Sequence, residues 1–254
     1  MSTRRITTAV AGRSLMLIPR MPSTFIPSLI MPIFFTIAIA GAFSGLVDLP
    51  GFPGEQMLDW VVPFTSLQGA AFAGITTGLG VARDLESGFF DRFLLSPVPR
   101  TSLLFGPLLA AVLRSFFAVS LTLAIGFLGG VNVPGGIAGI GMLILATIGV
   151  SLIAGEWATA LALRFKTMQA APLMQTAVFL SFFLSTAQMP LHLLTGWLHT
   201  VARFNPFTNI LELARQGFLG QVTWQNTWPG LVSMAGLITV LGVFAYRSMQ
   251  KVTP

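Results

Sequence analysis

The chain carries little charge. Only 9% of its 254 residues are Asp, Glu, Lys or Arg, whereas 54% are hydrophobic. A soluble domain carries roughly 25% charged residues because its surface must face water. The composition therefore excludes an ordinary soluble domain and predicts a protein whose apolar side chains are solvated by lipid.

Several chemical motifs are also absent. The lack of cysteine excludes disulfides, a thiolate metal site and a cysteine nucleophile. No G-x-x-x-x-G-K-[ST] motif is present, so the chain does not cradle ATP through a P-loop of its own. His192 and His199 are seven residues apart, which is not the i,i+4 spacing of a zinc pair. We therefore expect neither catalysis nor a metal or cofactor on this chain.

The N-terminus carries basic residues that do not form a signal peptide. Arg4 and Arg5 resemble a signal n-region, but Arg13 and Arg20 interrupt the stretch where an apolar core would follow. No small-residue cleavage site is present. We expect this segment to stay uncleaved.

Long charge-free intervals predict six membrane-spanning helices. Each interval holds the roughly 20 apolar residues that a span needs, and the Gly- and Pro-containing stretch 129–136 divides the longest of them. The expected spans are residues 25–46, 60–82, 104–128, 136–163, 172–190 and 228–246. We thus predict an all-α fold that forms a single domain over residues 1–254.

The basic residues orient these spans. An even number of spans places both termini on one side, and 11 of the 14 basic residues fall there. They are Arg4, Arg5, Arg13, Arg20, Arg83, Arg92, Arg100, Arg164, Lys166, Arg247 and Lys251. The positive-inside rule predicts that both termini are cytoplasmic. This spread along one membrane face argues against nucleic-acid binding, which needs a concentrated patch. Interfacial anchors are expected near the outer span ends at Trp60, Trp197, Trp224 and Trp228.

The cytoplasmic loop after the second predicted span alternates charged with apolar residues. Leu85, Phe89 and Phe93 recur at i, i+4 and i+8, the spacing of an amphipathic helix, and Pro97 ends the pattern. Two interpretations remain open: a helix that lies on the lipid headgroups, or a docking helix for a cytosolic partner.

The outer segment between the fifth and sixth predicted spans is apolar but too short to cross the membrane and return. Such segments are interfacial or re-entrant. Asn205 and Pro206 predict a helix start, with Asn as the N-cap and Pro in the first turn. Glu212 is placed to pair with Arg215 or Arg203.

Two features inside the spans predict contacts between helices. Gly74 and Gly78 have the small-xxx-small spacing of close helix packing. Arg114 and Glu156 are expected at similar depths in neighbouring spans, where an unpaired charge is costly. We predict that they form an intramembrane ion pair, with independent snorkelling to the headgroups as the alternative.

The order of these features resembles the membrane subunits of ABC-2-type exporters, the drug- and lipid-efflux permeases exemplified by daunorubicin-resistance transporters. The resemblance covers essentially the whole chain. It rests on the charged N-terminal arm, the six spans, Glu86-Ser87-Gly88, Pro97-Val98-Pro99-Arg100, and the outer Asn205-Pro206-Phe207-Thr208 with Leu211 and Arg215. One departure is Phe89, where loops of the family often have threonine after the glycine.

The resemblance implies roles for both loops. Residues 84–96 would be the coupling helix that contacts the ATPase, and residues 191–226 the outer re-entrant pair that caps the pathway. The implied coupling residues are Asp84, Leu85, Glu86, Ser87, Gly88, Phe89, Asp91, Arg92, Phe93, Pro97 and Arg100. The implied outer gate comprises Asn205, Pro206, Phe207, Glu212 and Arg215.

The same resemblance implies the partners and the mechanism. Two separate ATP-binding subunits would carry ATP and Mg²⁺, and a second permease subunit, identical or homologous, would complete the assembly in a bacterial cell membrane. ATP would close the nucleotide-binding subunits, and the coupling helix would pass this motion to the spans, giving alternating access.

An aromatic pathway would suit a hydrophobic or amphiphilic substrate, such as a drug, an antibiotic or a lipid, exported outward. The expected wall residues are Phe64, Phe72, Phe179, Phe182 and Phe183. Plain lipid contact is the alternative for each of them. Two other functions stay open: a secondary, ion-coupled transporter, which needs intramembrane acids or broken helices, and a non-transporting assembly or sensor subunit.

Overall fold

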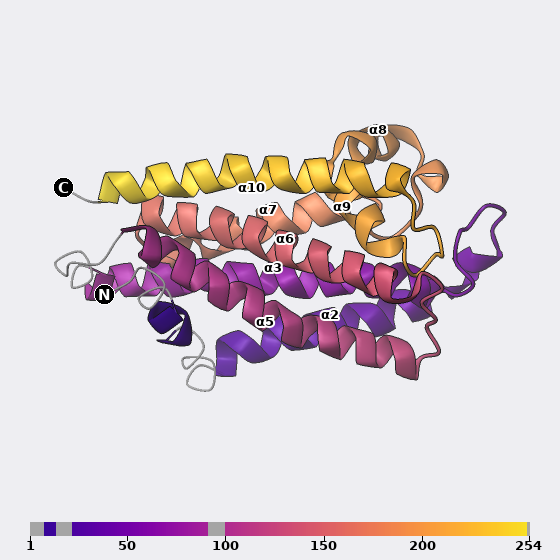
Figure 1. Cartoon of the computed structure of the whole chain (residues 1–254), viewed down its shortest axis with the longest axis horizontal. Helices are drawn as coiled ribbons and strands as arrows, with labels where there is room; N and C mark the ends of the chain where they lie inside the picture. Colours follow the sequence, from indigo (N-terminus) through magenta and orange to yellow (C-terminus); the bar gives the residue numbers. More distant parts are fainter. Residues whose placement is uncertain (1–7, 14–21, 91–99, 253–254) are drawn as a thin grey trace.

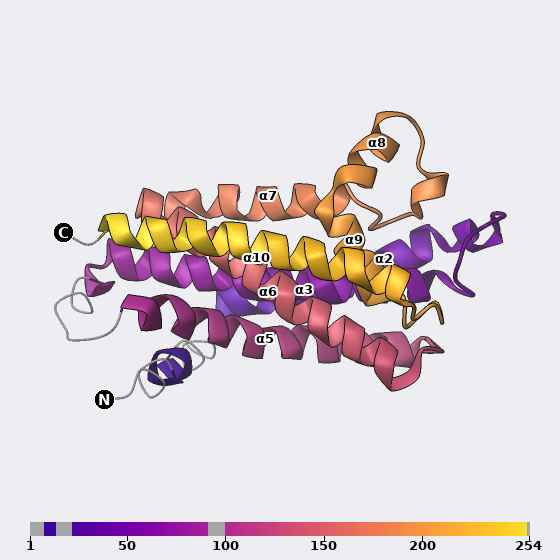
Figure 2. The same ribbon diagram turned by 45° about the horizontal axis from the view of Figure 1, so that its top comes forward.

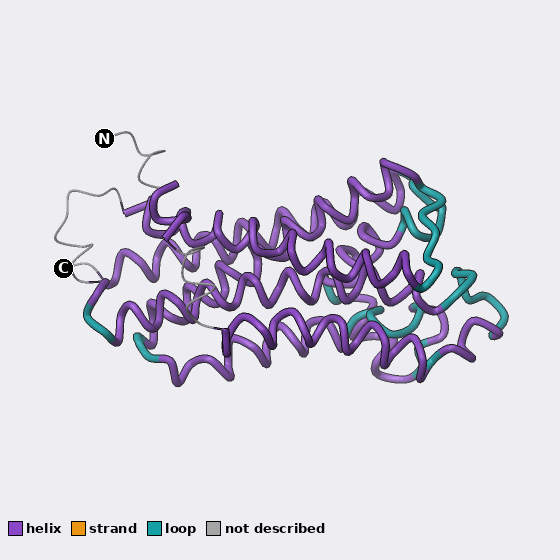
Figure 3. The backbone as a smooth tube through the Cα atoms, turned by 90° about the horizontal axis from the view of Figure 1, so that it is seen from below, coloured by secondary structure: helices purple, strands orange, loops and turns teal. Residues whose placement is uncertain are grey.

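The computed structural model of the protein describes residues 8–13, 22–90 and 100–252. This part of the chain is built from helices and loops, with no strand (Figure 3). Six longer helices are α2 (Pro22–Ala42), α3 (Met57–Glu86), α5 (Arg100–Leu128), α6 (Gly136–Phe165), α7 (Ala171–Phe183) and α10 (Trp224–Val252). Shorter elements are η1 (Ser44–Asp48), η2 (Met168–Ala170), η3 (Leu191–Leu193), α8 (Gly196–Phe204) and α9 (Pro206–Arg215).

Helix α3 is the centre of the bundle. It contacts α2, α5, α6, α7 and α9, and 22 of its 30 residues are buried. Helix α10 packs against α6 and α9, while α7 and α5 lie along opposite edges of the bundle in Figure 2. A residue of α3 therefore meets protein on almost every side.

The two ends of the bundle differ in their helices and in their share of basic residues. The helix at residues 8–13 and the C-terminal end of α10 lie at one end, and the short helices α8 and α9 lie toward the other (Figure 1). The C-terminal end of α3, the start of α5 and the loop after α6 share the first end (Figure 1). This arrangement brings most of the basic residues of the described chain to one end.

Among the residues that the structure describes, three helices have the length and composition to cross a membrane: α5, α6 and α10. Helix α3 is equally long, but its hydroxyl and amide side chains lower its hydropathy, and burial among other helices removes the need for a lipid-compatible surface. Helix α7 has 13 residues, about 20 Å at 1.5 Å per residue, so it is shorter than the roughly 30 Å hydrocarbon core.

The helix limits correct several expectations. The fifth helix ends at Phe183 rather than at residue 190, and the first ends at Ala42 rather than at residue 46. The second and sixth extend beyond the expected limits, to Met57–Glu86 and Trp224–Val252. The third begins at Arg100 and the fourth ends at Phe165, within a turn of the expected limits.

The predicted glycine packing is confirmed at the α3–α6 contact. A Cβ atom on Gly74 would lie 2.5 Å from the carbonyl oxygen of Ser151 and 2.7 Å from the backbone nitrogen of Gly155. A Cβ on Gly78 would collide with the backbone of Ala158. The two helices approach so closely because these positions carry no side chain.

The predicted ion pair between Arg114 and Glu156 is wrong. The Arg114 guanidinium donates to the hydroxyl of Thr77, and Glu156 lies against α10, with Oε1 3.2 Å from where a Cβ on Gly242 would be. The reason is the rotation of α6 about its axis. Gly155 takes the position facing α5, and the next residue points about 100° away.

Candidate functional site

The five predicted wall phenylalanines come together between α3 and α7. Phe72 packs edge-on against Phe179 with ring centroids 5.4 Å apart, and Phe179 stacks on Phe183 at 6.1 Å. Phe64 contacts Phe183 at 6.4 Å and Phe182 at 5.8 Å. We call these five residues the aromatic row.

The aromatic row also reaches the end of the bundle that carries α8 and α9. Phe207 on α9 packs edge-on against Phe182 with ring centroids 5.0 Å apart. Phe64 and Phe182 are fully buried, whereas Phe72, Phe179 and Phe183 are half-buried. The row is therefore tightly packed where it meets α9 and partly exposed at Phe72, Phe179 and Phe183.

The last turn of α3 is tied to the N-terminal helix. Both guanidinium nitrogens of Arg13 donate to the carboxylate of Asp84 at 2.9 Å, a bidentate ion pair. The Arg13 guanidinium also lies 4.3 Å from the ring centroid of Phe89. One cation therefore links three segments: the N-terminal helix, the end of α3 and the turn that follows.

Glu86 links α3 to the start of the α7 region. Its Oε1 accepts hydrogen bonds from the hydroxyl of Thr167 and from the backbone N–H of Met168, both at 2.7 Å. These bonds hold the pKa of the Glu86 carboxyl below its usual range, the Met168 bond most of all. The carboxylate form is therefore favoured by folding, and this contribution is lost as the pH falls through the lowered pKa.

The segment predicted as a coupling helix is divided in the structure. Asp84, Leu85 and Glu86 belong to the last turn of α3, and the chain turns at Ser87 and Gly88, where Gly88 has a φ of +68°. Glycine adopts this conformation without strain, so it permits the turn. Of the remaining coupling residues, Asp91, Arg92, Phe93 and Pro97 lie outside the described residues, and Arg100 is the first residue of α5.

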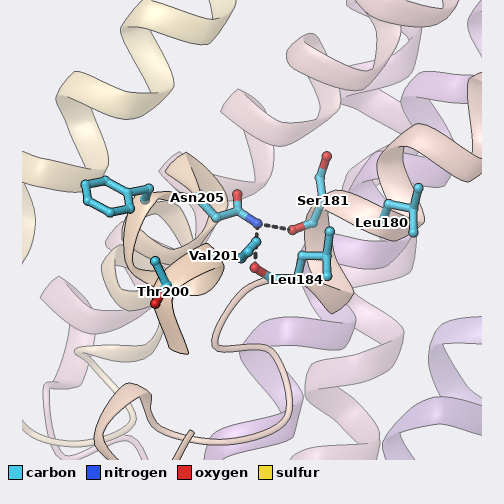
Figure 4. A pocket seen from close by; sticks show the side chains of 7 residues that line it. Leu180, Ser181, Leu184, Thr200, Val201 and Asn205 are labelled. Atoms are coloured by element: carbon cyan, nitrogen blue, oxygen red, sulfur yellow. Dashed lines mark hydrogen bonds between the residues drawn. The ribbon is translucent and has the colours of Figure 1, made fainter. Parts of the chain in front are cut away.

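The outer helix α9 starts as predicted. Asn205 is its N-cap, because the side-chain oxygen accepts from the backbone N–H of Phe207 at 2.9 Å, and Pro206 follows in the first turn. The side-chain nitrogen of Asn205 donates to the carbonyl oxygens of Ser181 and Leu184, at 2.7 and 2.9 Å (Figure 4). Asn205 thus caps the start of α9 and the end of α7 at once.

Arg215 lies completely buried at the end of α9. Its Nε donates to the carbonyl oxygen of Trp60 at 3.1 Å, and its terminal nitrogens donate to the carbonyl oxygen of Ala187 at 2.8 Å and the hydroxyl of Thr186 at 3.3 Å. Glu212 forms the predicted ion pair with it at 3.4 Å. Arg215 therefore fastens α9 to the start of α3 and to the chain that leaves α7.

Trp60 corrects the expectation that it anchors the protein at the interface. It is only 2% exposed, and the guanidinium of Arg215 lies 3.7 Å from the centroid of its ring. Trp197, Trp224 and Trp228 are exposed at the outer end, as surface anchors would be. The sequence predicts that Trp60 lies near the end of a span. Nothing in the sequence predicts that Arg215, 155 residues later, packs against its ring.

An open pocket of about 500 Å³ lies between the end of α7 and α8 (Figure 4). Apolar side chains dominate its lining, and Asn205 forms part of its wall. The lining residues are Leu180, Ser181, Leu184, Thr200, Val201, Phe204 and Asn205. The amide nitrogen of Asn205 is engaged in capping α7, so the pocket is an apolar surface rather than a polar binding site.

The two histidines are not part of a metal-binding cluster among the described residues. The Nε2 atom of His192 lies 3.0 Å from the carbonyl oxygen of Gly51, in the loop between η1 and α3. Within residues 8–13, 22–90 and 100–252, no group of three or more acidic or histidine side chains is placed to hold a metal ion.

Sequence reasoning missed several residues that organise the site. Neither spacing nor charge singles out Thr167 or Thr186 in the sequence. In the structure Thr167 donates a hydrogen bond to Glu86, and Thr186 accepts one from Arg215. From the sequence, Arg13 contributes only to the excess of basic residues on one side of the membrane. In the structure it forms an ion pair with Asp84. No local pattern identifies such partners, because the contacts join segments 29 to 81 residues apart.

Known proteins with similar sequences agree with this architecture. Residues 6–219 match the family described as ABC-2 type transporter. A daunorubicin resistance ABC transporter permease protein of Streptomyces coeruleorubidus is 25% identical over 240 residues, covering 92% of this chain and 82% of the relative. A putative transport permease of Porphyra purpurea is 24% identical over 263 residues, covering 96% and 88%.

A third relative is a probable multidrug ABC transporter permease of Escherichia coli strain K12. It is 26% identical over 187 residues, which cover 70% of this chain and 48% of the relative. Together with the apolar helices, these similarities make the chain a membrane protein and, more specifically, the membrane subunit of an ABC exporter. The chain belongs to the ABC-2 type transporter family.

Proposed function

We propose that the chain exports a hydrophobic or amphiphilic small molecule, with energy from ATP hydrolysed on separate subunits. The aromatic row supports this substrate class, because its rings offer flat apolar contacts and no charge. The relatives named for daunorubicin resistance and multidrug transport fit planar aromatic drugs of this kind. Daunorubicin is therefore a suitable probe substrate.

The proposed assembly contains two copies of this permease, or this chain with a homologous one, and two ATP-binding subunits. The six longer helices would act as six spans, α7 together with η2 before it and the chain that follows it. Both termini and the basic end of the bundle would lie in the cytoplasm of a bacterial cell. Helices α8 and α9 would sit as a re-entrant cap at the outer face. Alternating access would follow from movement of α7 relative to α3.

The observation that carries the proposal is the contact of Glu86 with the start of the α7 region. Residues 84–96 would dock on the ATPase, and Arg13 would hold the first part of that segment through Asp84 and Phe89. Glu86 extends the connection to Thr167 and Met168, directly before α7. Helix α7 carries three of the five residues of the aromatic row. A displacement of the docking segment by the ATPase would therefore be transmitted through α7 to the proposed pathway.

Replacing Glu86 by alanine tests this connection. Both hydrogen bonds to the 167–168 turn are lost, so we expect drug transport per ATP hydrolysed to fall several-fold while the ATPase rate stays near wild type. The measurement is daunorubicin uptake and phosphate release by the same vesicles carrying the permease with its ATPase.

Two variants control for side effects. Glu86→Gln keeps an oxygen that accepts both bonds and should retain most of the coupling. Glu55→Ala removes an exposed acid at the opposite end and should leave coupling unchanged. Wild-type coupling in Glu86→Ala would show that force does not pass through this contact.

A further inference from the structure

Gln68 is a buried amide without a hydrogen-bond partner. Its side chain is 2% exposed, and neither Oε1 nor Nε2 has a partner in the part of the chain that the structure describes. Burial removes the water molecules that hydrogen-bond the amide, and no protein group replaces them. The unpaired amide therefore destabilises the folded state. A leucine would fill similar space without that cost.

The other hydroxyl side chains of α3 are satisfied. Thr65 accepts from Thr36 on α2, and Ser66 bonds to Thr122 on α5 at 2.7 Å. Thr76 donates to the carbonyl oxygen of Ala73, and Thr77 donates to that of Pro107. The packing of this helix thus provides for its hydroxyl groups but not for the amide of Gln68 or for the indole N–H of Trp60.

Gln68 lies on the face of α3 that carries the aromatic row. Phe64 is four residues before it and Phe72 four residues after it, so the three side chains follow one another along one side of the helix. Both phenylalanines contact α7, through Phe182 and Phe179 respectively. Thr65 and Ser66 face α2 and α5 instead.

The position of Gln68 is also deep in the bundle. It is 11 residues from the start of α3 and 18 from its end, about 16 and 27 Å at 1.5 Å per residue. At that depth no headgroup or bulk water is at hand to satisfy the amide. A group that enters between α3 and α7 is the partner that the surroundings allow.

We propose that Gln68 is a specificity-determining residue that hydrogen-bonds a neutral polar group on the transported molecule, while the aromatic row holds its apolar body. An amide offers one acceptor and two N–H donors and carries no charge. The ligand class is therefore a flat aromatic amphiphile with a hydroxyl, carbonyl or amide group. This inference rests on the proposed function, since it places the ligand along the aromatic row.

A matched pair of fluorescent probes tests the proposal: 9-anthracenemethanol and 9-methylanthracene, which differ by one hydroxyl. Binding to the full-length permease in nanodiscs is corrected for partition into empty nanodiscs. We expect wild type to bind the alcohol about tenfold more tightly, the value of one hydrogen bond of about 1.4 kcal/mol. Gln68→Leu should abolish the preference while keeping the affinity for 9-methylanthracene.

Stability separates this role from a structural one. Gln68→Leu should leave the thermal unfolding midpoint unchanged or raise it, because it removes an unpaired polar group. Ser66→Ala, on the face toward α5, should keep the preference for the alcohol.

Three results would overturn the assignment. They are an unchanged preference in Gln68→Leu, a lowered unfolding midpoint in that variant, and wild type that binds both probes equally. If wild type binds neither probe, the aromatic row is not the pathway, and the proposed function fails together with this inference.

Discussion

Replacing Arg215 by leucine is expected to lower the stability of the folded chain by about 3–5 kcal/mol, the usual effect of removing one partner from a buried charged network. The carbonyl oxygens of Trp60 and Ala187 and the hydroxyl of Thr186 would lose the donor that Arg215, itself fully buried, provides. The stacking on Trp60 would also be lost. The measurement is the thermal unfolding midpoint of the purified protein in detergent.

Two further arginine variants sharpen this test. Arg215→Lys keeps the charge but not the planar fork that reaches several acceptors, so an intermediate loss is expected. Arg203→Leu, an exposed arginine at the end of α8, should change stability by no more than about 0.5 kcal/mol. An Arg215→Leu protein that unfolds at the wild-type temperature would contradict the role given to this network.

Replacing Gly74 by leucine should separate α3 from α6. The first atom of the new side chain would lie 2.5 Å from the carbonyl oxygen of Ser151 and 2.7 Å from the nitrogen of Gly155. Both are backbone atoms, so the helix itself must move, and overpacking of this kind costs about 1–3 kcal/mol or more. We expect a clear fall in folded yield and in the unfolding midpoint.

Gly80 provides the matched control on the same helix. A Cβ there would meet no atom within 4 Å, so Gly80→Leu adds the same side chain at a position whose Cβ has open space. Its higher helix propensity should leave stability unchanged or slightly raised. Equal effects of the two substitutions would mean that helix composition, not the close approach of α3 and α6, determines the result.

The longer helices could be predicted because charge is excluded from lipid along whole spans. The glycine contact and the start of α9 were predictable from local sequence patterns: Gly74 and Gly78 have the four-residue spacing of small residues at helix contacts, and Asn205 directly precedes Pro206. The five phenylalanines were expected as wall residues because the chain resembles exporters, and the structure brings their side chains together between α3 and α7.

Contacts between distant segments could not be predicted. The end of α7 is set by Asn205, which caps its last carbonyl groups from 21 to 24 residues away. The rotation of α6 about its axis is set by close packing at Gly155, and it directs Glu156 toward α10. Residue counts along a helix can predict depth, but rotation about the helix axis depends on tertiary packing.

The most direct test of ATP-driven export is daunorubicin uptake by inverted vesicles that contain this chain and its partner P-loop ATPase. We predict uptake that requires ATP, disappears when the P-loop lysine of the ATPase is replaced, and persists when proton and sodium gradients are dissipated. Uptake that follows an ion gradient without the ATPase would identify a secondary transporter and contradict the account. Absence of uptake in vesicles whose ATPase is active and bound to this chain would contradict it equally.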